Sequence, residues 1–93
     1  DSGGTAADIT ENEIIEAVHL LARSGYFVEP SSAASVAGAV KAARSGRLSS
    51  DETVVCLVTG SGAKWPEVMS AFVDSEALIE PSWEEITARA GLD

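Results

Sequence analysis

The sequence has little of what nucleic-acid and membrane partners require. Its 93 residues carry six lysines and arginines against fifteen aspartates and glutamates, which gives a formal net charge of −9. Because phosphate surfaces bind clustered cations, this balance argues against nucleic acid and anionic lipid as partners. No apolar run approaches the roughly 20 residues that a membrane-spanning helix needs.

Cysteine and histidine each occur once. A single cysteine excludes an intrachain disulfide, and Cys56 lies in the most apolar run, so we expect a small buried hydrophobe and a reducing, cytoplasmic setting. His19 has no second histidine with which to bind a metal ion. We expect it to lie at the boundary of a helix rather than to act as a ligand or a base, and we predict no metal site.

Aromatic residues are also scarce, at 5% of a chain that is 45% hydrophobic. Many of the apolar residues are alanines, so the core must be built from small side chains in close contact. A chain of this length forms one small, modestly stable domain. The opening residues, Asp1–Ala6, are typical of a flexible connection, and we expect the chain to be the tail of a longer polypeptide.

Two helices are indicated in the first half of the chain. Thr10 followed by Glu13 is a capping-box pattern, which predicts a helix that begins at Glu11 and ends near Gly25. Pro30 suits the first turn of a second helix, which runs to Arg44 and is almost entirely small residues. Gly38 in its middle predicts the close approach of another backbone.

Two short strands are predicted around the second helix. Tyr26–Val28 is a short aromatic run, and Thr53–Thr59 is a β-branched apolar run without alternation, as in a parallel strand covered on both faces. Strand, helix and strand form a βαβ unit with a right-handed crossover. After Pro66 we expect a short helix through Val73, a linker over 74–81, and a last helix between the Ser82 cap and Gly91.

Polar residues follow both predicted strands. Glu29 and Ser31 come after the first strand, and a glycine-rich loop, Thr59–Gly62, follows the second. Parallel strands end on one edge of a sheet, so the two segments should line one crevice, where open α/β sheets bind ligands. The loop matches neither the P-loop nor the dinucleotide pattern. The residues alone equally allow a tight turn, a solvated Glu29, and Ser31 or Ser32 as a helix cap.

The order of these segments resembles the carboxyl-terminal part of threonine synthases. The matching segments are Ile9-Thr10-x-x-Glu13-Ile14, Leu20-Leu21-Ala22-Arg23, Tyr26-Phe27-Val28-Glu29-Pro30-Ser31-Ser32-Ala33-Ala34, and Val54 to Val58 with Thr59-Gly60-Ser61-Gly62-x-Lys64. Threonine synthases are fold-type II, tryptophan-synthase-β-like enzymes that depend on pyridoxal phosphate. The resemblance covers Asp1 to Pro66, and threonine and serine dehydratases share the layout.

The resemblance implies a fold and a site. The fold is a partial three-layer α/β unit, with 1–66 as the βαβ portion of a large domain and 67–93 as a helical tail of unassigned role. Thr59 matches the hydroxyl residue that bonds the cofactor's pyridine nitrogen, and Lys64 matches a structural lysine. The other cofactor-binding residues implied are Gly60, Ser61, Gly62, Glu29 and Ser31. The Schiff-base lysine and the phosphate-binding loop have no counterpart here, so we expect the chain alone to be inactive and to bind no cofactor.

The function implied is that of a lyase which converts O-phosphohomoserine and water to threonine and phosphate, with this chain as one wall of the cofactor site. Its partners would be the remainder of the polypeptide and, in the intact enzyme, a small amino-acid substrate. We also expect self-association through the edge of Thr53–Thr59 or through the apolar tail. The alternatives are the tail of a dehydratase, or an independent acidic α/β module that binds a partner protein.

Overall fold

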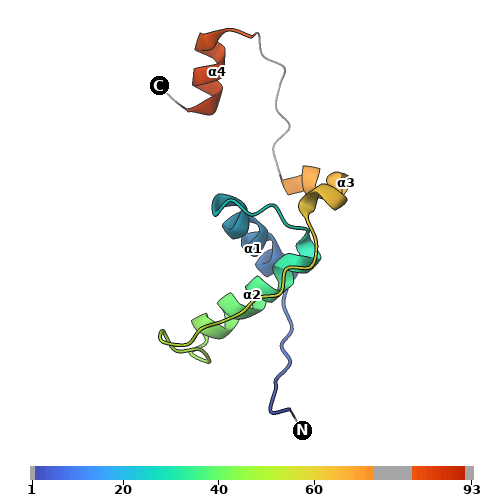
Figure 1. Ribbon diagram of the computed structural model, residues 1–93, viewed down its shortest axis with the longest axis vertical. Coiled ribbons are helices and arrows are strands. Elements are labelled where there is room, and N and C mark those ends of the chain that lie inside the picture. The colour runs from blue at the N-terminus through green and yellow to red at the C-terminus, as the bar shows by residue number, and fades with distance from the viewer. Residues whose placement is uncertain (1, 73–80, 92–93) are drawn as a thin grey trace.

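Two packed helices form the centre of the structure (Figure 1). The computed structural model describes residues 2–72 and 81–91. Helix α1 spans Glu11–Arg23 and helix α2 spans Pro30–Arg44. The shorter elements are η1 (Gly62–Lys64), α3 (Pro66–Met69), η2 (Ser70–Phe72) and α4 (Trp83–Ala90). In the described ranges, no helix combines the length and the apolar character that crossing a bilayer would take.

Helix α1 begins with the predicted capping box. Thr10 Oγ1 accepts a hydrogen bond from Glu13 N at 3.2 Å, and Thr10 N donates to the Glu13 carboxylate at 2.6 Å. The bond from the Thr10 backbone, with further help from the Lys41 ammonium, lowers the pKa of Glu13 below its ordinary value. Gly25 follows the helix with a φ of 90°, the left-handed conformation expected after a helix end. Both predicted boundaries of α1 are confirmed.

Removing the cap with Thr10→Ala is expected to cost about 1 kcal/mol of unfolding free energy, because Glu13 N loses the Thr10 hydroxyl that accepts its hydrogen bond. Thermal unfolding followed by circular dichroism measures this cost. Since the pKa of Glu13 is lowered on folding, the contribution of its carboxylate is present at neutral pH and is lost as the pH falls through the lowered value. Thr5→Ala, in the exposed amino-terminal arm, is the control and should leave the melting curve unchanged.

The core is small and rich in alanine, as predicted. Ala33 is 0% exposed and Ala37 3%, and both face α1 at the helical spacing of four residues. The remaining buried hydrophobic residues are Ala17, Val18, Val28 and Met69. The short side chains of both helices pack together in this core, and Met69 of α3 belongs to the same cluster.

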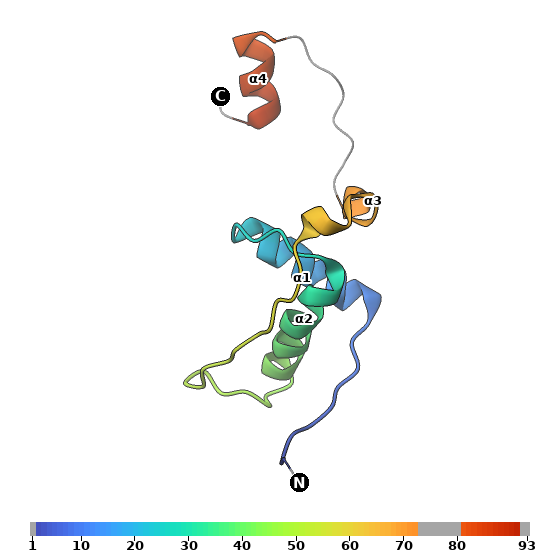
Figure 2. The same ribbon diagram turned by 45° about the vertical axis from the view of Figure 1, so that its right-hand side comes forward.

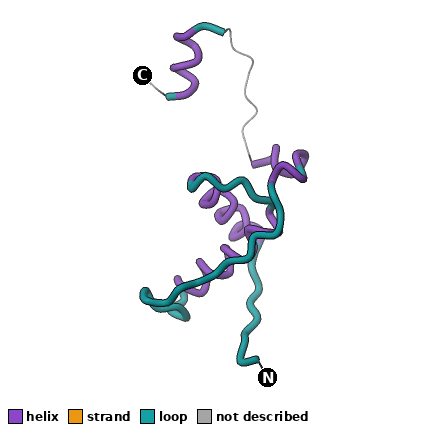
Figure 3. Tube along the Cα trace, viewed as in Figure 1, coloured by secondary structure: helices purple, strands orange, loops and turns teal. Residues whose placement is uncertain are grey.

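The predicted parallel strands are not formed in the described part of the chain, where the only pairing is an isolated antiparallel bridge between Val28 and Ser61. The chain from Arg47 to Gly60 is drawn as irregular backbone throughout (Figure 3). It returns along α2, as a βαβ crossover requires (Figure 2). However, Tyr26–Val28 is too short to carry a ladder, and without neighbouring strands an extended segment has no partner for its amides.

The prediction that Thr53–Thr59 is buried on both faces is wrong for this structure. Val55 is 83% exposed and Leu57 75%. The opposite side of the segment faces α2, where Ser35 Oγ donates to Leu57 O at 2.8 Å and Cys56 Sγ lies 3.8 Å from Ser35 O. Cys56 is therefore partly buried rather than buried, because only α2 covers the segment among the described residues.

The second half of the chain follows the prediction in part. The helix expected after Pro66 divides into α3 and the 3₁₀ turn η2, and Val73 lies outside the described residues, as do residues 74–80 of the predicted linker. Helix α4 begins where Ser82 Oγ accepts from Glu85 N at 3.2 Å, and Gly91 has a φ of 67°. The close backbone contact predicted at Gly38 is absent from the described residues, because a Cβ built there meets open space.

Candidate functional site

The glycine-rich loop and the turn before α2 meet, as the sequence predicts. Glu29 N donates to Gly60 O at 3.2 Å, and Gly62 N donates to Phe27 O at 3.1 Å. These two bonds make the antiparallel bridge, so the contact forms beyond the end of the extended segment rather than between parallel strands. The loop is thus fastened to the start of α2.

Ser32 is the polar centre of the junction, which is the contact between the loop Thr59–Gly62 and the turn before α2. Its side chain is 1% exposed on the first turn of α2. Ser32 Oγ accepts from Thr59 N at 2.9 Å and from Gly60 N at 2.7 Å, and it lies 3.1 Å from Thr59 Oγ1. Two loop amides that would otherwise be unpaired are therefore satisfied by one buried hydroxyl.

Glu29 is buried beneath the loop. It is 6% exposed, and its carboxylate lies 3.8 Å from Lys64 Nζ. Glu29 is the N-cap residue of α2, but its side chain makes no cap hydrogen bond. A solvated carboxylate at a strand end, which the residues alone allowed, is therefore excluded.

Both loop glycines lie in close contact with side chains of the turn. A Cβ at Gly60 would come within 2.5 Å of the carboxyl carbon of Glu29, and one at Gly62 within 2.7 Å of the Phe27 ring. Neither glycine has a positive φ. Glycine is used at these two positions because the loop lies against the turn. It is not used to permit an unusual backbone conformation.

The remaining predicted site residues are placed differently. The Ser61 side chain is exposed and accepts from Ala63 N at 3.2 Å, which caps η1. Ser31 is exposed, and the serine that contacts the loop is its neighbour Ser32. Sequence reasoning considered Ser32 only as a helix cap. The three-residue spacing of Ser32 and Ser35 on one face of α2 was the signal, since both bond the same returning segment.

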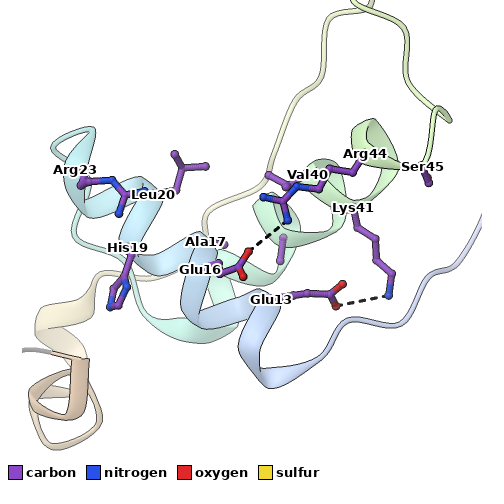
Figure 4. A pocket seen from close by; sticks show the side chains of 11 residues that line it. Glu13, Glu16, Ala17, His19, Leu20, Arg23, Val40, Lys41, Arg44 and Ser45 are labelled. Atoms are coloured by element: carbon purple, nitrogen blue, oxygen red, sulfur yellow. Dashed lines mark hydrogen bonds and ion pairs between the residues drawn. The ribbon is translucent and has the colours of Figure 1, made fainter.

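A separate groove of about 650 Å³ lies between α1 and α2. Figure 4 shows two ion pairs across it, with Arg44 and Glu16 3.3 Å apart and Lys41 and Glu13 3.5 Å apart. These ion pairs bridge the two helices, and Arg23 also lines the groove. Neither the loop nor the turn lines it.

His19 serves no metal site in the described part of the chain. It is exposed at the edge of α1, where its ring meets Phe72 edge-on with centroids 6.3 Å apart. Within residues 2–72 and 81–91, no three histidine, cysteine, aspartate or glutamate side chains gather as metal ligands would. The exposed position of His19 at the edge of α1 is the one expected from the sequence, and the absence of a metal site stays a prediction.

Comparison with known proteins places this junction in a family. The family model described as "Pyridoxal-phosphate dependent enzyme" matches residues 1–60, which include Glu29, Ser32 and Thr59. A threonine synthase of Methanocaldococcus jannaschii is 51% identical over 67 residues, which are 71% of this chain and 16% of that protein. One from Mycobacterium leprae is 43% identical over 88 residues, 85% of this chain and 24% of the relative.

A third relative, the threonine synthase of Halalkalibacterium halodurans, is 38% identical over 86 residues, 91% of this chain and 24% of the relative. The chain therefore spans a quarter or less of the length of these curated relatives. The match of the family model to more than half of the chain identifies the family. The chain belongs to the pyridoxal-phosphate dependent enzymes, and the relatives it matches are threonine synthases.

Proposed function

We propose that this chain forms one wall of the cofactor site of a threonine synthase-like lyase, which converts O-phosphohomoserine and water to threonine and phosphate. The observation that carries the proposal is the hydroxyl of Thr59, an exposed residue on a loop that Ser32 fastens to α2. The names of the relatives favour threonine synthase over a dehydratase. We keep the assignment to the cytoplasm, with which the free Cys56 agrees.

The donors at the junction fit a pyridoxal phosphate ring. Thr59, an exposed residue, offers a neutral hydroxyl, and the amides of Thr59 and Gly60 are occupied by Ser32. A neutral hydroxyl can donate to a ring nitrogen but cannot keep it protonated as an aspartate would. When bound, the cofactor would supply a moderate electron sink, which suits elimination and replacement at the β or γ carbon of an amino acid.

Each residue of the junction has a distinct part in this proposal. Thr59 would hold the cofactor ring at its nitrogen, and Ser32 would hold Thr59. Gly60 and Gly62 allow the loop to lie on the turn, and the buried Glu29 with Lys64 fixes the loop from below. Ser61 and Ser31, both exposed, remain proposed contacts beside the ring. The catalytic lysine and the phosphate-binding loop would come from another part of the enzyme.

The predicted strands would form in the intact enzyme. We propose that Thr53–Thr59 pairs with strands of the remaining polypeptide, which would cover Val55 and Leu57, and that 1–66 belongs to the large domain while 67–93 forms a tail. The exposed valines and leucine of this segment support the proposal. In the chain alone the same edge would pair with a second copy, which sedimentation would detect as a dimer or larger species.

Thr59→Val tests the proposed function in the intact enzyme that carries this segment. The change keeps the shape but removes the donor, so the affinity for pyridoxal phosphate should fall about threefold to tenfold, the worth of one hydrogen bond. Cofactor titration by absorbance measures the affinity, and phosphate release from O-phosphohomoserine measures the reaction. Thr59→Ser keeps the hydroxyl and should retain the wild-type affinity.

Two results would contradict this proposal. An intact wild-type enzyme that binds no pyridoxal phosphate would remove the cofactor assignment. An enzyme that binds the cofactor but deaminates threonine or serine, and releases no phosphate from O-phosphohomoserine, would be a dehydratase.

A further inference from the structure

Ser32 uses both of its acceptor positions on the backbone of the loop. A hydroxyl oxygen has two lone pairs and one proton. The backbone amides of Thr59 and Gly60 can only donate, and both lie within hydrogen-bond distance of Ser32 Oγ, at 2.9 and 2.7 Å. The third neighbour of Ser32 Oγ within the described residues is Thr59 Oγ1, at 3.1 Å.

This arrangement decides which of the two hydroxyls donates. If Thr59 donated to Ser32, the serine oxygen would accept three hydrogen bonds, and its own proton would have no partner in a site that is 1% exposed. An unpaired buried donor is costly. If Ser32 donates to Thr59, every hydrogen-bonding position of the serine is used once. The second arrangement is therefore the stable one.

The consequence falls on Thr59. Its oxygen accepts from Ser32, so its own proton is not consumed inside the protein, and the side chain is exposed. The group best matched to this proton is an acceptor without a hydrogen, such as an unprotonated aromatic nitrogen. A protonated ring nitrogen could only donate to the remaining lone pair of Thr59, and it could not accept the Thr59 proton.

We propose that Ser32 is a positioning residue which reserves the Thr59 proton for the cofactor and thereby keeps the ring nitrogen unprotonated. The inference rests on the proposed function, because it needs the ring nitrogen to lie at Thr59. It assigns to a buried serine of α2 a part in the electronic state of the cofactor, beyond fastening the loop.

The test uses the intact enzyme loaded with pyridoxal phosphate that carries ¹⁵N at the ring nitrogen. In the wild type, the ¹⁵N resonance should be that of an unprotonated nitrogen which accepts a hydrogen bond. Ser32→Ala and Thr59→Val should both move it toward the value of a nitrogen without a donor. The cofactor dissociation constant should rise about threefold to tenfold in both variants.

A pH titration of the same resonance separates positioning from fastening. A donor hydrogen bond stabilises the unprotonated nitrogen, so Ser32→Ala should let the nitrogen take up a proton at a higher pH than in the wild type. Ser35→Ala is the matched control, since it removes another α2 hydroxyl that bonds the same segment, at Leu57 O and 2.8 Å. It should leave both the resonance and its titration unchanged.

The outcomes distinguish the two proposals. If Ser32→Ala keeps the wild-type resonance and titration while Thr59→Val changes them, the role of Ser32 is overturned and the proposed function stands. If neither variant changes them, the ring nitrogen does not lie at Thr59, and the proposed function fails as well.

Neutron diffraction tests the inference on the deuterated wild-type enzyme, so it does not depend on the folding of a variant. It should place the shared deuterium on Ser32 Oγ, directed toward Thr59. A deuterium on Thr59 directed at Ser32 would overturn the inference.

Discussion

Replacing Ala33 by leucine is expected to lower the unfolding midpoint of the chain strongly. Ala33 is 0% exposed, and the core around it consists of small residues from α1, α2 and the turn between them, together with Met69 of α3. Three added carbons cannot enter this space unless the two helices separate. Overpacking of this kind costs about 1–3 kcal/mol, occasionally more, and a domain of this size has little stability to lose.

Circular dichroism with thermal and urea unfolding measures the effect of Ala33→Leu. The matched control is Ala43→Leu, because Ala43 is an exposed alanine of the same helix. The control should unfold with the wild-type midpoint, since a surface leucine on a helix changes stability little. An Ala33→Leu chain with the wild-type midpoint would show that α1 and α2 do not pack through this residue.

Gly60→Ala is expected to detach the loop from the turn. The added carbon would displace the Glu29 carboxylate, which is buried and lies 3.8 Å from Lys64 Nζ. Moving this carboxylate breaks the ion pair and strains the bond from Glu29 N to Gly60 O. We expect a loss of about 1–3 kcal/mol in unfolding free energy, and a matching loss of cofactor affinity in the intact enzyme.

Gly38→Ala is the matched control for this substitution. A Cβ at Gly38 meets nothing within 4 Å, and the residue lies in the middle of α2. Alanine there should stabilise the chain by roughly 0.5–1 kcal/mol, because it favours the helix over the unfolded chain. Urea unfolding compares the two variants directly. A Gly60→Ala chain as stable as Gly38→Ala would contradict the close packing of loop and turn.

Local signals in the sequence were sufficient for the helices and for the meeting of the two motifs. The capping pair Thr10 and Glu13, Pro30 at the first turn of α2, and the left-handed glycines after the helices act over a few residues, so their effect does not depend on the rest of the fold. The meeting of the Glu29 turn with the Thr59 loop could be predicted because the chain returns along α2.

The features that the sequence did not predict depend on contacts between distant parts of the chain. The apolar run around Val55 has the composition of a buried strand, but a strand needs partners, and none lies beside it in the described residues. Choosing Ser32 over Ser31 required the helical phase of α2, which turns by about 100° between neighbours. The burial of Glu29 depends on the absent side chain at Gly60, a relation between distant residues that no local pattern contains.

The most direct measurement of the central claim is a crystal structure of the intact enzyme with pyridoxal phosphate bound. Our account predicts the Thr59 hydroxyl within hydrogen-bond distance of the ring nitrogen, with Ser32 still bonded to the amides of Thr59 and Gly60. A ring nitrogen bonded to another residue, or a loop that has left Ser32, would contradict it.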